Sequence, residues 1–152
     1  MDRVYKTFRL AYETHYWLHM LVEYQDKQLP NNILENIEND ILNKYQLDGY
    51  AFFFTLNATT GTIIELAVKE AENLTLDEWN DLAIEVEKAK HNIKNFNEKF
   101  STPKVLLSKR TIQKLEEYQI NLRQDNKRVP IMPYVIKLAV YNLYKKLILA
   151  SS

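Results

Sequence analysis

The chain has 152 residues, of which 46% are hydrophobic and 12% aromatic, and this composition excludes an intrinsically disordered protein. Two glycines and four prolines are too few for a turn-rich all-β sandwich, so helices should dominate. The 20 basic residues balance 20 acidic residues, but ten basic residues and only three acids lie between Ser101 and Ser152. A basic C-terminal third favours a polyanion as partner.

The absence of cysteine excludes disulfides and thiolate metal sites, and it favours a cytoplasmic location. The first 17 residues carry charges throughout and lack an apolar core, so we expect no signal peptide. The apolar run from Tyr134 to Ala150 is interrupted by Lys137, Lys145 and Lys146, so we expect no membrane span and no membrane partner.

The first 46 residues are expected to form a strand followed by two helices. Apolar and polar residues alternate from Val4 to Leu10, and this alternation predicts a strand. One helix is predicted from about Tyr12 to Gln25. A second is predicted from Asn31 to Tyr45, where apolar residues recur at helical spacing.

The central residues 47–100 are expected to form a β-hairpin and a long helix. Two β-rich runs between Tyr50 and Val68 flank the turn-forming segment from Asn57 to Gly61, which predicts the hairpin. Thr75 and Glu78 have the spacing of a capping box, which predicts a helix from about Leu76 to Phe100. Its buried stripe is expected to be Trp79, Leu82, Ala83, Val86, Ala89, Ile93 and Phe96.

Residues 101–152 predict a second strand-helix-helix unit. Val105 and Leu107 would point to one face of a strand that runs from Thr102 to Leu107, and Ser108 would cap the helix after it. The last helix has Pro133 in its first turn. It is apolar on most sides, so more than one neighbour must cover it.

The first and last units align with each other. A shift of 97 residues places Phe8 on Val105 and Leu18 on Leu115, and a shift of 102 then places Ile37 on Ala139. Either the units are a duplication or their apolar positions agree by chance. We expect a single compact domain over residues 1–152, helix-dominated α+β, with two strand-helix-helix units that flank a central β-hairpin and a long helix. In a duplicated protein, strands 5–10 and 102–107 pair within the chain as a pseudo-dimer; otherwise they pair between two chains of a homodimer.

The short strand, capped helix, basic connector and apolar last helix over Thr102 to Leu149 resemble the ribbon-helix-helix family of Arc- and MetJ-like repressors. A weaker resemblance covers Val4 to Tyr45. It implies an antiparallel ribbon that enters the major groove of duplex DNA. The DNA-binding residues that it implies are Tyr5, Thr7, Arg9, Thr102, Lys104 and Leu106 at the bases, with Lys127 and Arg128 near a phosphate. Leu106 at a base-facing position, the long connector and the 50-residue centre depart from the family pattern.

No phosphate loop, nucleophile elbow or HExxH motif is present, so we expect neither an enzyme nor a cofactor. His15, His19 and Glu23 share a helix face without a further ligand, which favours surface or partly buried histidines over a metal site. Asn, Lys, Ile and Tyr are frequent, as in AT-rich mobile elements. The expected function is therefore a repressor, or an accessory protein of plasmid or phage replication or transfer.

Two other interpretations stay open. In the first, a phage- or plasmid-borne inhibitor binds a host protein through its acidic N-terminal half. Its aromatic anchors would be Tyr12, Tyr16, Trp17 and Tyr24. In the second, residues 101–152 are the C-terminal part of one α+β core, and their basic side chains form a solvated face.

Overall fold

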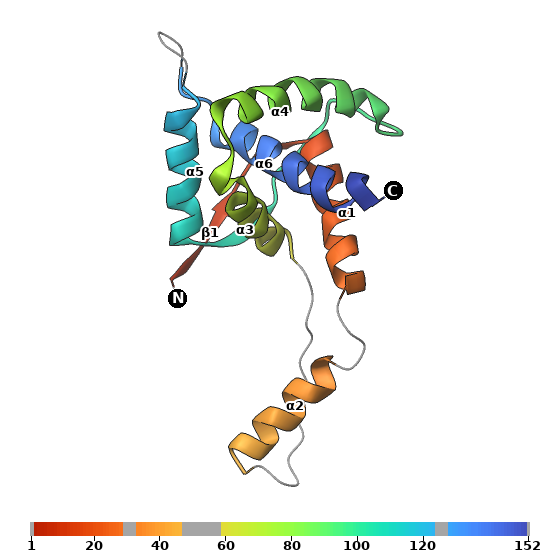
Figure 1. Ribbon diagram of the computed structural model, residues 1–152, viewed down its shortest axis with the longest axis vertical. Helices are drawn as coiled ribbons and strands as arrows, with labels where there is room; N and C mark the ends of the chain where they lie inside the picture. The colour runs from red at the N-terminus through yellow and green to blue at the C-terminus, as the bar shows by residue number, and fades with distance from the viewer. Residues whose placement is uncertain (1, 29–32, 47–58, 124–127, 152) are drawn as a thin grey trace.

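The computed structural model describes residues 2–28, 33–46, 59–123 and 128–151 (Figure 1). Helices dominate it, and its strands form two two-stranded sheets, so the helix-dominated α+β class is confirmed. The elements are β1 (Arg3–Thr7), β2 (Leu10–Ala11), α1 (Tyr12–Gln28), α2 (Ile33–Lys44), α3 (Thr60–Glu70), α4 (Leu76–Ala89), β3 (Phe100–Ser101), β4 (Lys104–Ser108), α5 (Lys109–Asn121) and α6 (Met132–Leu147), with short 3-10 segments at Ala71–Asn73, Lys90–Asn92 and Leu149–Ser151.

The strands form one interrupted antiparallel ribbon within the chain. β1 pairs with β4, with Tyr5 opposite Leu106, and β2 pairs with β3 in the same register. The Phe8 amide still donates to the Pro103 carbonyl across the break, at 3.3 Å. Pro103 has no N–H to return the bond, which accounts for the interruption. The pairing within the chain matches the pseudo-dimer alternative, although β1 ends at Thr7 and β4 begins at Lys104 rather than at Thr102.

Helix α6 lies at the centre of the core, between α1, α3, α4 and α5 (Figure 1). Val135, Ile136 and Ala139 on this helix are fully buried. The expectation that its apolar surface needs several neighbours is therefore confirmed, and Pro133 lies in its first turn as predicted. None of the helices in the described ranges is long and apolar enough to cross a bilayer.

The predicted hairpin is wrong in its second half, because Thr60–Glu70 is helix α3. Its first half, residues 50–58, lies outside the described residues. Thr59 caps α3 by accepting a hydrogen bond from the Thr62 amide at 3.1 Å. Ile63, Ile64 and Ala67 are then buried at helical spacing against the rest of the core. Packing of this face has overridden the strand preference of the β-branched residues.

The predicted long helix is also too long, because α4 ends at Ala89 and a 3-10 turn over Lys90–Asn92 follows. Asn95 adopts a left-handed conformation with φ of 63°, which asparagine tolerates better than most residues. Ile93 is nevertheless buried and Phe96 packs against the core, so both stripe residues keep their predicted role outside the helix. Phe100 begins strand β3 instead of ending the helix.

Helix α2 matches the helix predicted over 31–45, but Figure 1 shows it apart from the other helices. Its Ile41, one of the apolar residues at helical spacing, is 36% exposed. The helix that packs beside α1 and α6 is α3. The shift of 102 residues that aligned Ile37 with Ala139 is therefore wrong, because Ile37 and Ala139 do not occupy similar places in the fold.

The start of α4 confirms the predicted capping box and gives a first testable prediction. Thr75 Oγ1 accepts from the Glu78 amide at 3.2 Å, and the Thr75 amide donates to Glu78 Oε1 at 3.1 Å. Thr75→Ala should lower the free energy of unfolding by about 1 kcal/mol in urea denaturation, because one amide loses its acceptor. Asp81→Ala, an exposed change further along α4, is the control and should cause no such loss. Equal stability of Thr75→Ala and the parent protein would contradict the capping role.

The same cap predicts a dependence on pH. The hydrogen bonds with Thr75 lower the pKa of the Glu78 carboxyl below its ordinary value. Because the pKa of Glu78 is lowered in the folded state, its ionised carboxylate stabilises the folded protein at neutral pH. This stabilisation is lost as the pH falls through the lowered pKa.

Candidate nucleic-acid interface

The two long strands of the ribbon turn one face to the core and the other to solvent. Phe8 and Leu10 from one strand segment of the ribbon, and Val105 and Leu107 from the other, are buried on the same face. The residues that alternate with them are exposed and define the outer ribbon face, which consists of Tyr5, Thr7, Arg9, Thr102, Lys104 and Leu106. Side chains alternate between the two faces along a strand, so these six share one face. They are the six strand residues that the resemblance to the ribbon-helix-helix family implies at the bases.

The register sets these six residues opposite one another in pairs. Tyr5 faces Leu106, and Thr7 faces Lys104. The same register continues to Leu10 and Ser101, which sets Arg9 opposite Thr102. The outer ribbon face is therefore built from cross-strand pairs that the fold fixes relative to one another.

Two of the cations on this surface lie over aromatic rings. Lys104 Nζ lies 4.7 Å from the centre of the Tyr5 ring, and Arg9 Cζ lies 4.1 Å from the centre of the Phe100 ring. Both distances suit a cation–π contact, which restrains the long side chains without neutralising their charge. Phe100 was not predicted on this surface, because the sequence pattern placed it at the end of the long helix. The asparagine-rich segment before it was the signal that the helix had already stopped.

The outer ribbon face keeps its positive charge. Within the described residues, neither Arg9 nor Lys104 has a carboxylate within the 4.0 Å of an ion pair. Arg3, at the end of the ribbon, differs because it donates to Glu65 at 2.6 Å. The middle of the ribbon is thus the part whose charge is available to a partner.

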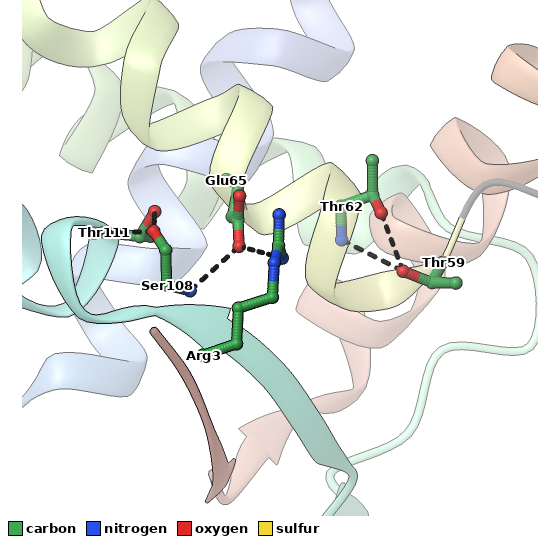
Figure 2. A network of polar contacts seen from close by, with 6 residues as sticks. All are labelled: Arg3, Thr59, Thr62, Glu65, Ser108 and Thr111. Atoms are coloured by element: carbon green, nitrogen blue, oxygen red, sulfur yellow. Dashed lines mark hydrogen bonds and ion pairs between the residues drawn. The ribbon is translucent and has the colours of Figure 1, made fainter. Parts of the chain in front are cut away.

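Glu65 fixes one end of the ribbon to helix α3. Figure 2 shows its carboxylate between the side chain of Arg3 and the backbone amide of Ser108, which donates to Glu65 Oε1 at 3.0 Å. Ser108 in turn caps α5 by accepting from the Thr111 amide at 3.2 Å, as predicted. One carboxylate therefore connects β1, α3 and the start of α5, and it makes the ribbon a supported surface.

Acids from the rest of the chain compensate part of the basic character of residues 101–152. Among the described residues, five basic side chains of this segment form ion pairs with acids from the first 100 residues, namely Lys109 with Asp2 (3.8 Å), Lys114 with Glu72 (3.3 Å), Lys137 with Glu13 (3.1 Å), Lys145 with Glu85 (2.8 Å) and Lys146 with Glu70 (3.6 Å). The hydrogen bond with Glu72 raises the pKa of Lys114 above its ordinary value. The charge asymmetry along the sequence is therefore weaker evidence for a polyanion partner than the exposed ribbon cations are.

Of the two residues predicted near a phosphate, the structure describes only Arg128. Lys127 lies outside the described residues. Arg128 is exposed and lines a hollow of about 290 Å³ together with Trp79 and Tyr134, and no residue of the outer ribbon face borders it. A larger hollow of about 430 Å³ lies between α3 and α5, where the Tyr118 hydroxyl donates to the Val68 carbonyl at 2.8 Å. Burial raises the pKa of Tyr118.

The remaining candidates lie mostly inside the fold or pair locally. His19 Nε2 is 3.1 Å from Glu23 Oε1, and the part of the chain that the structure describes holds no group of three metal-binding side chains. Trp17 is only 1% exposed, with its ring 4.7 Å from that of Tyr141, and Tyr12 packs edge-on against Phe96. Trp17 is therefore not available as an anchor for a host protein.

Comparison with known proteins found no matching family model, curated protein or solved structure. Function is therefore inferred from the chemistry of the outer ribbon face.

Proposed function

We propose that this chain is a small non-enzymatic protein that binds duplex DNA by inserting the outer ribbon face into the major groove. One observation carries the proposal: an intrachain two-stranded ribbon exposes Arg9 and Lys104 on one face, without acidic partners among the described residues. The major groove admits a two-stranded β-ribbon, and arginine and lysine donate to guanine there. The role would be that of a repressor, or of an accessory protein in plasmid or phage replication or transfer.

The burial pattern supports two ribbon-helix-helix units within the chain. At the shift of 97 residues, both members of each pair are buried for Phe8 and Val105, Leu10 and Leu107, Thr14 and Thr111, and Leu18 and Leu115. At a shift of 72 residues, α3 matches α6 in the same way through Ile63 and Val135, Ile64 and Ile136, Ala67 and Ala139, and Val68 and Val140. The units would be β1-α1-α3 and β4-α5-α6, with α2 in an insertion.

Binding should depend on the exposed ribbon cations. Arg9→Ala and Lys104→Ala should each weaken binding to a duplex by about 1–3 kcal/mol, because a base contact is lost. Both side chains are exposed, so truncation opens no cavity. Fluorescence anisotropy of a labelled duplex would measure the affinity between roughly 50 and 200 mM salt, where released counterions should make it fall steeply.

Lys88→Ala is the matched control, because it removes one exposed lysine from α4 and leaves the ribbon intact. This variant should keep nearly the parent affinity. Losses of equal size in Lys88→Ala and Lys104→Ala would show that net charge, and not the ribbon, determines binding. Absence of binding by the parent protein at low salt would refute the proposed function.

A further inference from the structure

The outer ribbon face has two chemically different halves. Thr7 and Lys104 form the middle pair of the six residues. On one side of this pair, Tyr5 is 63% exposed and lies opposite Leu106, which is 37% exposed. On the other side, the register sets Arg9 opposite Thr102. One half is therefore largely apolar, and the other carries a guanidinium.

These halves occupy equivalent places in the two units. The shift of 97 residues that matches the buried positions also places Tyr5 on Thr102 and Arg9 on Leu106. In a homodimer the two strands would be copies, so equivalent places would carry the same side chain and the DNA site would be palindromic. Here both strands belong to one chain and differ, so the symmetry requirement does not apply.

The chemistry of each half selects a different base. A guanidinium donates to both O6 and N7 of guanine, and Arg9 is already restrained by its contact with the Phe100 ring at 4.1 Å. Restraint before binding reduces the entropy that is lost when the contact forms. The apolar half offers no donor from Leu106, and apolar side chains contact the methyl group of thymine.

We propose that a single chain recognises an asymmetric duplex site, with a guanine at the end under Arg9 and thymine at the end under Tyr5 and Leu106. This proposal rests on the proposed function, and it adds the bases of the DNA site and the number of chains that bind it. Tyr5 and Arg9 are four residues apart on an extended strand, a separation of roughly 13 Å. At about 3.4 Å per base pair, the two ends of the site would be roughly four base pairs apart.

Selection from a pool of duplexes with a randomised centre would test this proposal, with native mass spectrometry to count chains per duplex. The expected result is one chain on a non-palindromic site with guanine at one end and thymine at the other. Arg9→Ala should reduce discrimination at the guanine position by about 5- to 150-fold and leave the thymine preference intact. Leu106→Ala should relax only the thymine preference.

Lys6→Ala is the control for these variants, because Lys6 is an exposed cation that alternates with Tyr5 and Thr7 on the same strand. This change should leave both base preferences unchanged. A palindromic site with two chains bound, or salt-dependent binding without base preference, would overturn the asymmetric site and leave the proposed function standing. Failure of the parent protein to retain any duplex would overturn both.

Discussion

Glu13→Ala is expected to lower the free energy of unfolding by about 3–5 kcal/mol, because it leaves the charge of Lys137 with little access to water. Glu13 lies in the first turn of α1, and its carboxylate is 3.1 Å from Lys137 Nζ on α6. The two side chains are only 6% and 16% exposed. Removing one partner from such a pair costs more than the pair itself contributes. Urea denaturation of the two proteins would measure the difference.

A double variant distinguishes the loss of the ion pair from the cost of leaving the charge of Lys137 unpaired. Glu13→Leu with Lys137→Met removes both charges and leaves apolar side chains of similar size, so it should recover most of the stability that Glu13→Ala loses. The exposed pair of Lys109 and Asp2 is the control, with side chains 62% and 82% exposed and atoms 3.8 Å apart. Asp2→Ala should have almost no effect. If Glu13→Ala were as mild as Asp2→Ala, the buried pair would not be important for the core.

The pair of Glu13 and Lys137 also has a counterpart at the other end of the ribbon. At the shift of 72 residues that matches α3 with α6, Lys137 corresponds to Glu65. Glu65 accepts from the amide of Ser108 at the start of α5, while Lys137 bonds Glu13 at the start of α1. Each of these charged residues on a central helix therefore contacts the start of a helix that directly follows a ribbon strand. These contacts give the outer ribbon face a fixed geometry from both ends.

Local signals were sufficient to predict the outer ribbon face from the sequence. Alternation of apolar and polar residues around Phe8 and Val105 identified the buried side of each strand, and the exposed side followed from it. Ser108 and Thr75 were recognisable as caps because each precedes a helix by one residue and reaches back to its first turn. Such features depend on neighbours within a few residues, so one sequence contains them.

The features that the sequence did not predict depend on partners far along the chain. Thr60–Glu70 contains several β-branched residues, and only its packing against α6 decides that it is helical. That α3 and not α2 packs beside α1 and α6 could not be inferred, because the pattern of α2 is equally regular. The ion pairs that compensate Lys145 and Lys146 involve Glu85 and Glu70, which lie 60 or more residues away. A charge count along the sequence cannot show such compensation.

Gly61→Ala is expected to destabilise the protein by about 2–3 kcal/mol, although alanine is the better helix former. Gly61 is in the first turn of α3, and a Cβ atom there would lie 2.5 Å from the backbone carbonyl oxygen of Leu106. A backbone atom of β4 cannot rotate away, so α3 must shift from the ribbon, and overpacking of this kind costs about 1–3 kcal/mol or more. Helix propensity alone would give the opposite sign, a gain of about 1 kcal/mol.

Whether Gly61→Ala lowers or raises the free energy of unfolding therefore tests how closely α3 approaches β4. Thermal and urea unfolding would measure it, with Lys69→Ala on the exposed side of the same helix as the control that should be neutral or slightly stabilising. Because a shift of α3 would also pull Glu65 away from the Ser108 amide, Gly61→Ala should weaken duplex binding as well. A higher melting temperature for Gly61→Ala would show that the helix and the ribbon are not in close contact. The inference that α3 supports the outer ribbon face would then be wrong.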